Sequence, residues 1–147
     1  AATWRNMFLS AARDLRQGPK SGLSTTSLDM ISAIPTDLLL DSIATRLDPA
    51  VIRNASVALN FNFADRNEKA RVTVENAVMI SEMGEAHAKP AVTLTGPRQF
   101  FLGLFFLKLP LAQLEAAGLK IEGDRTAIEA LQAAIETPPN VFNIVTP

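Results

Sequence analysis

Apolar residues recur at helical spacing over the first seventeen residues of the chain. They are Trp4, Phe8, Ala11 and Leu15, at positions i, i+4, i+7 and i+11 of one helical face. This pattern predicts a helix over Thr3–Gln17, which ends at Gly18 and Pro19 because proline cannot continue a helix. Ser, Thr and Gly then dominate the sequence. We therefore expect an N-terminal helix within 1–19, a linker over 20–27 and a domain over 28–147.

Within 28–147 the apolar period alternates between that of a helix and that of a strand. The pattern predicts five strands, over Val57–Ala64, Arg71–Glu75, Val78–Met83, Ala91–Thr95 and Leu119–Glu122. The predicted helices are Leu28–Ala33, Leu38–Leu47, Phe100–Leu107, Leu111–Ala117 and a last one carrying Ile128, Leu131 and Ile135 after the N-cap Asp124. We expect the apolar tail 140–147 to pack on this domain. The predicted fold is α+β, with helices over one face of a five-stranded, mainly antiparallel or mixed sheet.

The run 100–111 is apolar except for Lys108. On a helix, Phe101 and Phe105 share one face, while Phe100, Leu104 and Leu107 share another. Two apolar faces need two partners, and the domain itself supplies only one of them. We expect the other face to line an apolar cavity or an interface. A plain core helix is the alternative reading, because apolar runs are more often core than binding site.

The composition excludes several classes of function. Apolar residues make up 48% of the 147 positions and charged residues 20%, as in a globular domain. The net charge is −1, with no basic patch interleaved with aromatic residues, so nucleic acid is a poor partner. The run at 100–111 is too short for a membrane span, which needs about 20 residues.

The sequence offers no recognisable catalytic centre. It has no cysteine and a single histidine, His87, in a turn, where a solvated side chain is the usual case. Motifs for a zinc peptidase, a nucleophile elbow or a phosphate-binding loop are absent. Lys108 could meet an anionic head group, although a lysine snorkelling to the surface is the simpler reading. Asn60 and Asn62 are expected to face outward from the sheet rather than to bind a ligand.

Three segments carry a resemblance to a known family. They are Leu-Asn-Phe-Asn-Phe at 59–63, Gly-Leu-Lys-Ile-Glu-Gly-Asp at 118–124 and Phe-Asn-Ile-Val-Thr-Pro at 142–147. Over 28–147 the chain resembles the C-terminal domain of alkyl sulfatases, which has a fold similar to sterol carrier protein type 2. The helix at 3–18 resembles the last helix of that family's dimerisation region. Two features depart from the family pattern: the loop 48–55 is short, and the helix 100–107 is unusually aromatic.

The resemblance implies an apolar tunnel between sheet and helices that holds an alkyl or other lipid chain. The expected ligand-binding residues are Phe100, Phe101, Leu104, Phe105, Leu107, Leu39, Ile43 and Phe61. The resemblance also implies an upstream metallo-β-lactamase-type catalytic domain with two zinc ions, whose His-rich motifs have no match in this chain. No cofactor or metal is expected here, a homodimer is possible, and the protein would be soluble in the bacterial cytoplasm or periplasm.

Three hypotheses follow from the sequence. The first is a non-catalytic domain that binds apolar chains such as alkyl sulfates or fatty acyl groups and recruits substrate for a hydrolase. The second is a protein–protein interaction or dimerisation module that uses the apolar helix. The third, an independent hydrolase built on Asp and Glu, is the least favoured, because the carboxylates fall at turns, caps and polar faces.

Overall fold

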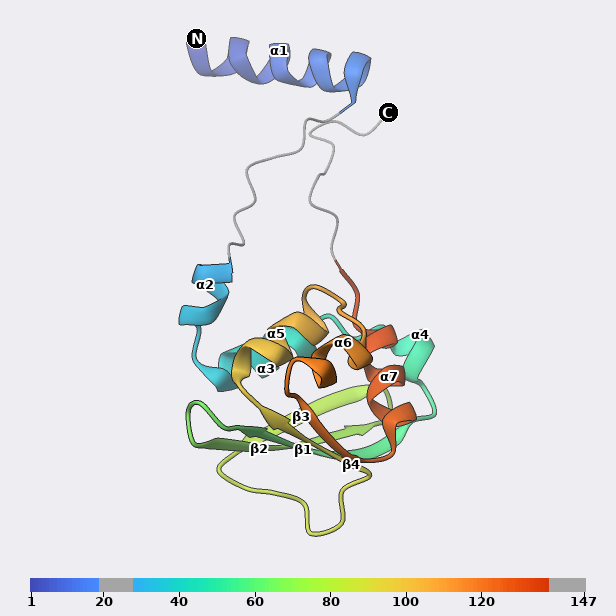
Figure 1. Cartoon of the computed structure of the whole chain (residues 1–147). Helices are drawn as coiled ribbons and strands as arrows, with labels where there is room; N and C mark the ends of the chain where they lie inside the picture. Colours follow the sequence, from blue (N-terminus) through green and yellow to red (C-terminus); the bar gives the residue numbers. More distant parts are fainter. Residues whose placement is uncertain (19–27, 138–147) are drawn as a thin grey trace. The chain divides into compact units, whose positions relative to one another are not determined.

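The computed structural model describes residues 1–18 and 28–137, which belong to two compact units. The first unit comprises 1–27 and 138–147, and the second comprises Leu28–Thr137 (Figure 1). The expected linker 20–27 and the tail 140–147 lie outside the described residues. The described part of the first unit is the helix α1 (Ala2–Gln17), which confirms the predicted helix. No residue of α1 is buried, and Trp4 and Phe8 are 68% and 69% exposed.

The second unit is built on a five-stranded mixed sheet, as the sequence predicts. Its strands are β1 (Ser56–Phe63), β2 (Glu68–Glu75), β3 (Val78–Met83), β4 (Val92–Gly96) and β5 (Lys120–Gly123). Their order across the sheet is β3-β2-β1-β4-β5. The pairing of β1 with β4 is parallel, and the other three pairings are antiparallel. Along β2, buried Ala70, Val72 and Val74 alternate with more exposed residues, so one face of the sheet is apolar.

The helices of this unit lie on that apolar side of the sheet, with α2 farther from the strands than the others (Figure 1). They are α2 (Leu28–Ala33), α3 (Thr36–Ala44), α4 (Pro49–Ile52), α5 (Arg98–Phe105), α6 (Leu111–Ala116) and α7 (Arg125–Ala134). The predicted bounds are right within a few residues, but α4 was not predicted. It begins where Asp48 Oδ1 accepts a hydrogen bond from Ala50 N at 2.8 Å, so Asp48-Pro49 starts a helix, whereas α3 already ends at Ala44.

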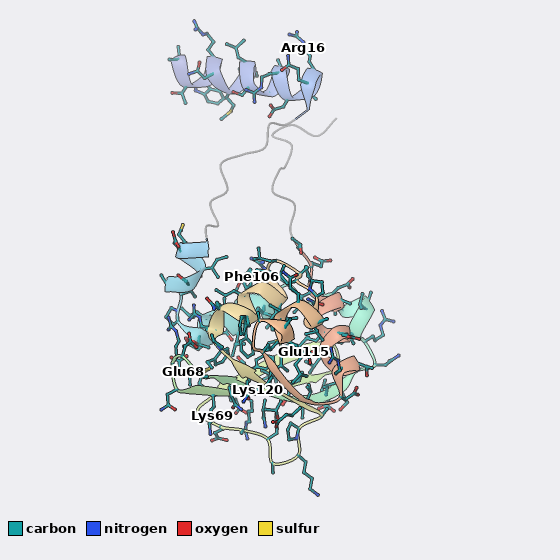
Figure 2. The ribbon with its side chains drawn as sticks, viewed as in Figure 1. Arg16, Glu68, Lys69, Phe106, Glu115 and Lys120 are labelled. Carbon is teal, nitrogen blue, oxygen red and sulfur yellow. The ribbon has the colours of Figure 1, made fainter. Side chains whose placement is uncertain are left out.

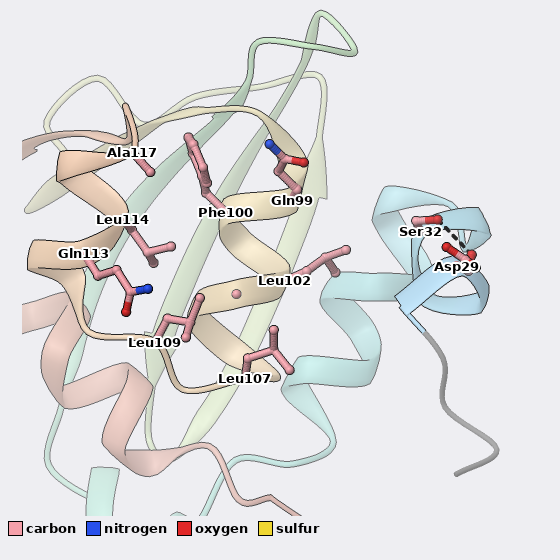
Figure 3. A pocket seen from close by; sticks show the side chains of 11 residues that line it. Asp29, Ser32, Gln99, Phe100, Leu102, Leu107, Leu109, Gln113, Leu114 and Ala117 are labelled. Carbon is pink, nitrogen blue, oxygen red and sulfur yellow. Dashed lines mark hydrogen bonds between the residues drawn. The ribbon is translucent and has the colours of Figure 1, made fainter. Parts of the chain in front are cut away.

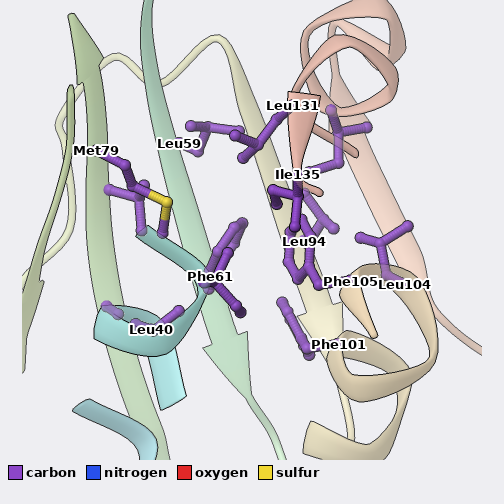
Figure 4. Packing of buried hydrophobic residues seen from close by; sticks show 14 of the residues in the cluster. Leu40, Leu59, Phe61, Met79, Leu94, Phe101, Leu104, Phe105, Leu131 and Ile135 are labelled. Carbon is purple, nitrogen blue, oxygen red and sulfur yellow. The ribbon is translucent and has the colours of Figure 1, made fainter. Parts of the chain in front are cut away.

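Phenylalanine rings from β1 and α5 form the centre of the core (Figure 4). The ring centroids of Phe63 and Phe101 lie 4.5 Å apart, and those of Phe61 and Phe101 lie 5.2 Å apart. Phe105 lies 6.0 Å from Phe61 by the same measure. These tilted ring pairs fill the space between α5 and the sheet. Among the described residues, therefore, this layer is a packed core, and the expected tunnel is not seen in it.

The opposite face of the sheet is crossed by the connection 84–91. β3 and β4 both run parallel to β1, so the chain must return from the end of β3 to the opposite end of the sheet before β4 begins. Figure 1 shows this loop on the side of the sheet away from the helices. Asn60 fixes the loop: its Oδ1 accepts from His87 N at 2.8 Å and its Nδ2 donates to His87 O at 3.0 Å. Asn60 thus faces outward as predicted, yet it is only 7% exposed.

In the segment Gly118–Asp124, the last two residues, Gly123 and Asp124, each have a structural role. Gly123 has φ of +108°, and a Cβ on it would lie 2.3 Å from Ala91 O. Asp124 N donates to Ala91 O at 2.8 Å, and Asp124 Oδ1 accepts from Thr126 N at 2.9 Å. The glycine therefore lets β5 end against the start of β4, and the aspartate begins α7, which confirms the predicted N-cap.

Candidate ligand-binding site

A groove of about 420 Å³ crosses the outer side of α5, the side turned away from the sheet. Figure 3 shows α6 on one side of α5 and α2 on the other. The lining residues are Asp29, Ser32, Gln99, Phe100, Leu102, Gly103, Leu107, Leu109, Gln113, Leu114 and Ala117. The volume falls within the range of about 300–1,000 Å³ that is typical of small-molecule sites. This groove is the candidate site.

Gly103 forms the floor of the groove, at the middle of α5. It lacks a side chain, so the turn after α5 can fold back over it. Leu109 N donates to Gly103 O at 3.0 Å, and a Cβ on Gly103 would lie 3.0 Å from Leu109 Cδ1. Lys108 makes the reversal with φ of +54°, after which Pro110 sits at the N-cap of α6. The small residue and the sharp turn together bring α6 against α5.

The lining is apolar at its centre and polar at its rim. Its apolar side chains are Phe100, Leu102, Leu107, Leu109, Leu114 and Ala117. Leu102 and Leu114 are largely buried in the fold, while Leu107 is 52% exposed. Asp29, Ser32, Gln99 and Gln113 supply the polar groups. Such a lining can hold an apolar chain, with hydrogen-bonding groups near the chain's ends.

The structure brings only part of the predicted site together. Phe100 and Leu107 line the groove, at the same α5 face as Gly103. The other six predicted residues lie in the core at 2% exposure or less: Leu39, Ile43, Phe61, Phe101, Leu104 and Phe105. Leu104 was expected to share a face with Phe100, but it packs on the core side. That these six contact a ligand stays a prediction.

Sequence reasoning missed Leu102, Gly103, Leu109 and Leu114 as lining residues. One signal was present, because Gly103 is the only small residue in the run Phe100–Leu107. A glycine inside an apolar helix costs about 0.5–1 kcal/mol relative to alanine, so it indicates a close approach by another element. Here that element is the turn carrying Leu109.

A buried arginine fastens α2, the far wall of the groove. Arg98 is 3% exposed, and its Nη2 donates to Ile31 O and to Ser32 O, both at 3.0 Å. Its Nη1 donates to Thr36 Oγ1 at 3.3 Å, and Thr36 Oγ1 in turn donates to Glu68. Burial lowers the pKa of Arg98, and nearby Arg66 lowers it further. The bonds to carbonyl oxygens at the end of α2 hold that helix beside α5.

Lys108 does not reach into the groove. Its Nζ donates to Gln132 O and Ile135 O at the end of α7, where a cation favourably meets the helix dipole. Burial lowers the pKa of this lysine. Gln132 Nε2 completes the contact by donating to Leu104 O at 3.0 Å and Leu109 O at 2.9 Å. The interaction joins α7 to the turn that closes the groove.

His87, the one histidine of the sequence, packs against the sheet. His87 was expected to be solvated, but its Nε2 lies 3.2 Å from Val72 O, against the sheet. In the described residues no three His, Cys, Asp or Glu side chains gather as a metal site would require. Nor does 1–18 or 28–137 contain a helix that is long and apolar enough to cross a bilayer.

Comparison with known proteins places the chain. Residues 24–147 match the family described as alkyl sulfatase C-terminal. The chain belongs to this family. A linear primary-alkylsulfatase from a Pseudomonas species is 31% identical over 147 residues, which cover 98% of this chain and 22% of the relative. The chain thus spans about a fifth of that relative's length and corresponds to the C-terminal part of an alkyl sulfatase.

Solved structures agree with the family and the fold. The stereoselective inverting sec-alkylsulfatase of a Pseudomonas species matches with a TM-score of 0.82 and 26% identity, over 97% of this chain and 23% of that one. A ubiquinone synthesis protein of the sterol carrier protein 2 type matches with a TM-score of 0.54 and 16% identity, over 71% and 91% of the two chains. The second likeness concerns the fold alone and confirms the predicted sterol-carrier-like architecture.

Proposed function

We propose that this alkyl sulfatase C-terminal domain is a non-catalytic binding module whose groove across α5 holds an apolar chain. The observation that carries the proposal is the apolar lining around Gly103, formed by Leu102, Leu109 and Leu114, in a groove of about 420 Å³ on the side of α5 that faces away from the sheet. Membership of the alkyl sulfatase family supports alkyl sulfates, fatty acyl groups and similar lipids as the ligand class. The sterol-carrier-like fold supports the same class.

In the complete protein we propose that the domain recruits substrate for a catalytic domain elsewhere in the chain. The relatives are named as alkylsulfatases and are more than four times as long as this segment. An upstream, zinc-dependent, metallo-β-lactamase-type domain would cleave the ester. The C-terminal domain would raise the local concentration of chain-bearing substrate, an effect of linkage that needs no new contact with the reacting atoms.

The dependence of affinity on the length of the ligand's alkyl chain tests this proposal. Each methylene that moves from water into an apolar site contributes about 0.8 kcal/mol, or roughly a fourfold gain in affinity. Partial burial in an open groove reduces the contribution of each methylene. We therefore expect affinity to rise about twofold to fourfold per methylene until the groove is full. Calorimetric titration of the 147-residue chain with primary alcohols of increasing length measures it. Absence of binding at every length would exclude the proposal.

A second candidate function, docking or dimerisation, is favoured by α1 rather than by α5. Trp4, Met7, Phe8 and Leu15 are each more than half exposed on this helix, whereas the apolar residues of α5 are mostly in the core. An exposed apolar stripe on a helix suits a second helix as partner. Sedimentation with and without ligand separates the two functions: an oligomer that a Trp4→Ala, Phe8→Ala variant loses without losing alcohol binding assigns association to α1.

A further inference from the structure

The charges around the groove are unsuited to an anionic head group. Among the lining residues that the structure describes, Asp29 is the one charged side chain, and it is exposed. The other polar lining groups are the uncharged side chains of Ser32, Gln99 and Gln113. A sulfate or carboxylate bound beside Asp29 would face its carboxylate, and the described lining residues include no cation to offset it.

The cations that the structure describes near the groove already have partners. Arg98 lies behind α2, where its guanidinium donates to Ile31 O, Ser32 O and Thr36 Oγ1. Arg66 donates to Ser32 O from the outside at 3.4 Å. Lys108 donates to carbonyl oxygens at the end of α7. Glu68 and Asp65 lie close enough to Arg98 to offset part of its charge, since both raise the pKa of that guanidinium.

The positive end of α5 is also occupied. A helix N-terminus offers free N–H groups to an anion, and Gln99 and Phe100 of the groove lie in this first turn. Asp65 Oδ1, however, accepts the Arg98 N–H at 2.9 Å, so a carboxylate of the protein fills that position. Gln99 therefore offers a neutral amide beside a helix end that is already neutralised.

We infer that the groove selects uncharged amphiphiles, and long-chain alcohols in particular, over the sulfate esters of the same chain. A hydroxyl can both donate to Asp29 and accept from a glutamine amide, whereas a sulfate can only accept. The inference rests on the proposed function, that the groove holds an alkyl chain. The sulfate ester is still recruited by its alkyl chain, with its head group in water, while the alcohol binds more tightly. Hydrolysis of an alkyl sulfate by water gives the alcohol and hydrogen sulfate, so the groove would favour the organic product of the parent enzyme's reaction and keep the anionic head of the substrate outside.

The test compares decan-1-ol with sodium decyl sulfate at equal chain length, by calorimetry on the whole 147-residue chain. Ligand stays below its micellar concentration, and far-UV circular dichroism confirms that the protein remains folded. At an ionic strength of about 0.01 M, where charges are weakly screened, we expect decanol to bind at least about fivefold more tightly. Asp29→Asn should improve decyl sulfate binding by about threefold, because a repulsive charge at an exposed site is removed, and leave decanol unchanged.

Asp37→Asn is the matched control, since Asp37 occupies the same first-turn position on α3 and is not among the lining residues. It should change neither affinity. Added salt should narrow the gap between the two ligands in the parent chain. Equal or tighter binding of decyl sulfate, or an Asp29→Asn variant without effect on it, overturns the inference while the chain-binding function stands. If neither ligand binds, it is the proposed function that fails.

Discussion

Leu109 packs directly over Gly103, so that a Cβ on the glycine would lie 3.0 Å from Leu109 Cδ1 and 3.4 Å from Leu114 Cδ2. Gly103→Ala should therefore push Leu109 into the groove and narrow it. Alanine improves helix propensity by up to about 1 kcal/mol, which offsets the crowding, so stability should change little. We expect decanol affinity to fall by about 1 kcal/mol, the equivalent of one lost methylene contact, by calorimetry.

The same variant distinguishes the groove from the core as the ligand site. A chain lodged between α5 and the sheet would not contact residue 103, which faces Leu109 and Leu114. Unchanged decanol affinity in a Gly103→Ala protein with normal thermal stability would contradict the groove.

Arg98→Met should loosen α2, the far wall of the groove. The substitution leaves Ile31 O and Ser32 O without their buried donor. We expect a loss of about 2–4 kcal/mol in the free energy of unfolding, measured by urea denaturation, and faster amide exchange at Ile31 and Ala33. Arg66→Met is the control: Arg66 is exposed and donates to Ser32 O at 3.4 Å, so it should cost less than about 1 kcal/mol.

The two variants test one claim about α2. If Arg98→Met and Arg66→Met destabilise the protein equally, the buried guanidinium is not what holds the helix. If Arg98→Met does not fold, Arg98→Lys still serves, because an ammonium can satisfy only part of the same set of acceptors and should give an intermediate exchange rate.

Lys108 gives stability a pH dependence in the alkaline range. Burial lowers its pKa in the folded state below the value of 10.5 that applies in the unfolded chain. Between those two values the unfolded chain binds more protons, so stability rises with pH across the window and this contribution is least below the folded pKa. Relative to Lys108→Met, the parent chain should therefore gain stability as pH rises from neutral to 10.5.

Methionine is a suitable replacement because it keeps an unbranched chain at a position with φ of +54°. At neutral pH the variant should lose about 1–3 kcal/mol, since Gln132 O and Ile135 O lose their donor. Urea denaturation at several pH values measures both effects. A stability difference that stays constant with pH would show that Lys108 titrates alike in both states.

The spacing of apolar residues predicted the secondary structure because segments with the helical period and segments with the strand period do not overlap along the sequence. Alternation in 57–64 and 71–75 predicted β1 and β2, and the Asp124 cap predicted the start of α7. The parallel pairing of β1 with β4 was less accessible. This pairing requires the loop 84–91 to cross the outer face of the sheet. Asn60 holds the loop there through two hydrogen bonds to the backbone of His87. A contact of this kind leaves no periodic pattern in the sequence.

The site was harder to predict than the fold. Both faces of α5 are apolar, so the pattern could not say which face meets the sheet, and it gave no sign that Leu104 lies fully in the core. Arg98, next to Gly96 and Pro97, has the sequence of a polar helix start, yet the end of α2 buries it. Charged residues such as Lys69 and Lys120 do lie exposed at the surface (Figure 2). Arg98 differs from these lysines because its hydrogen-bond acceptors, on Ile31, Ser32 and Thr36, lie far from it in the sequence.

The most direct test determines where in the domain the alkyl chain of the ligand binds. Methyl NMR spectra of the protein, recorded during titration with decan-1-ol, report on leucines in both places. Binding in the groove should shift the signals of the groove residues Leu102, Leu107, Leu109 and Leu114 and leave those of the core residues Leu39, Leu59 and Leu104 unchanged. Shifts concentrated at Leu39, Leu59 and Leu104, with the groove leucines unmoved, would place the ligand between sheet and helices and contradict the account.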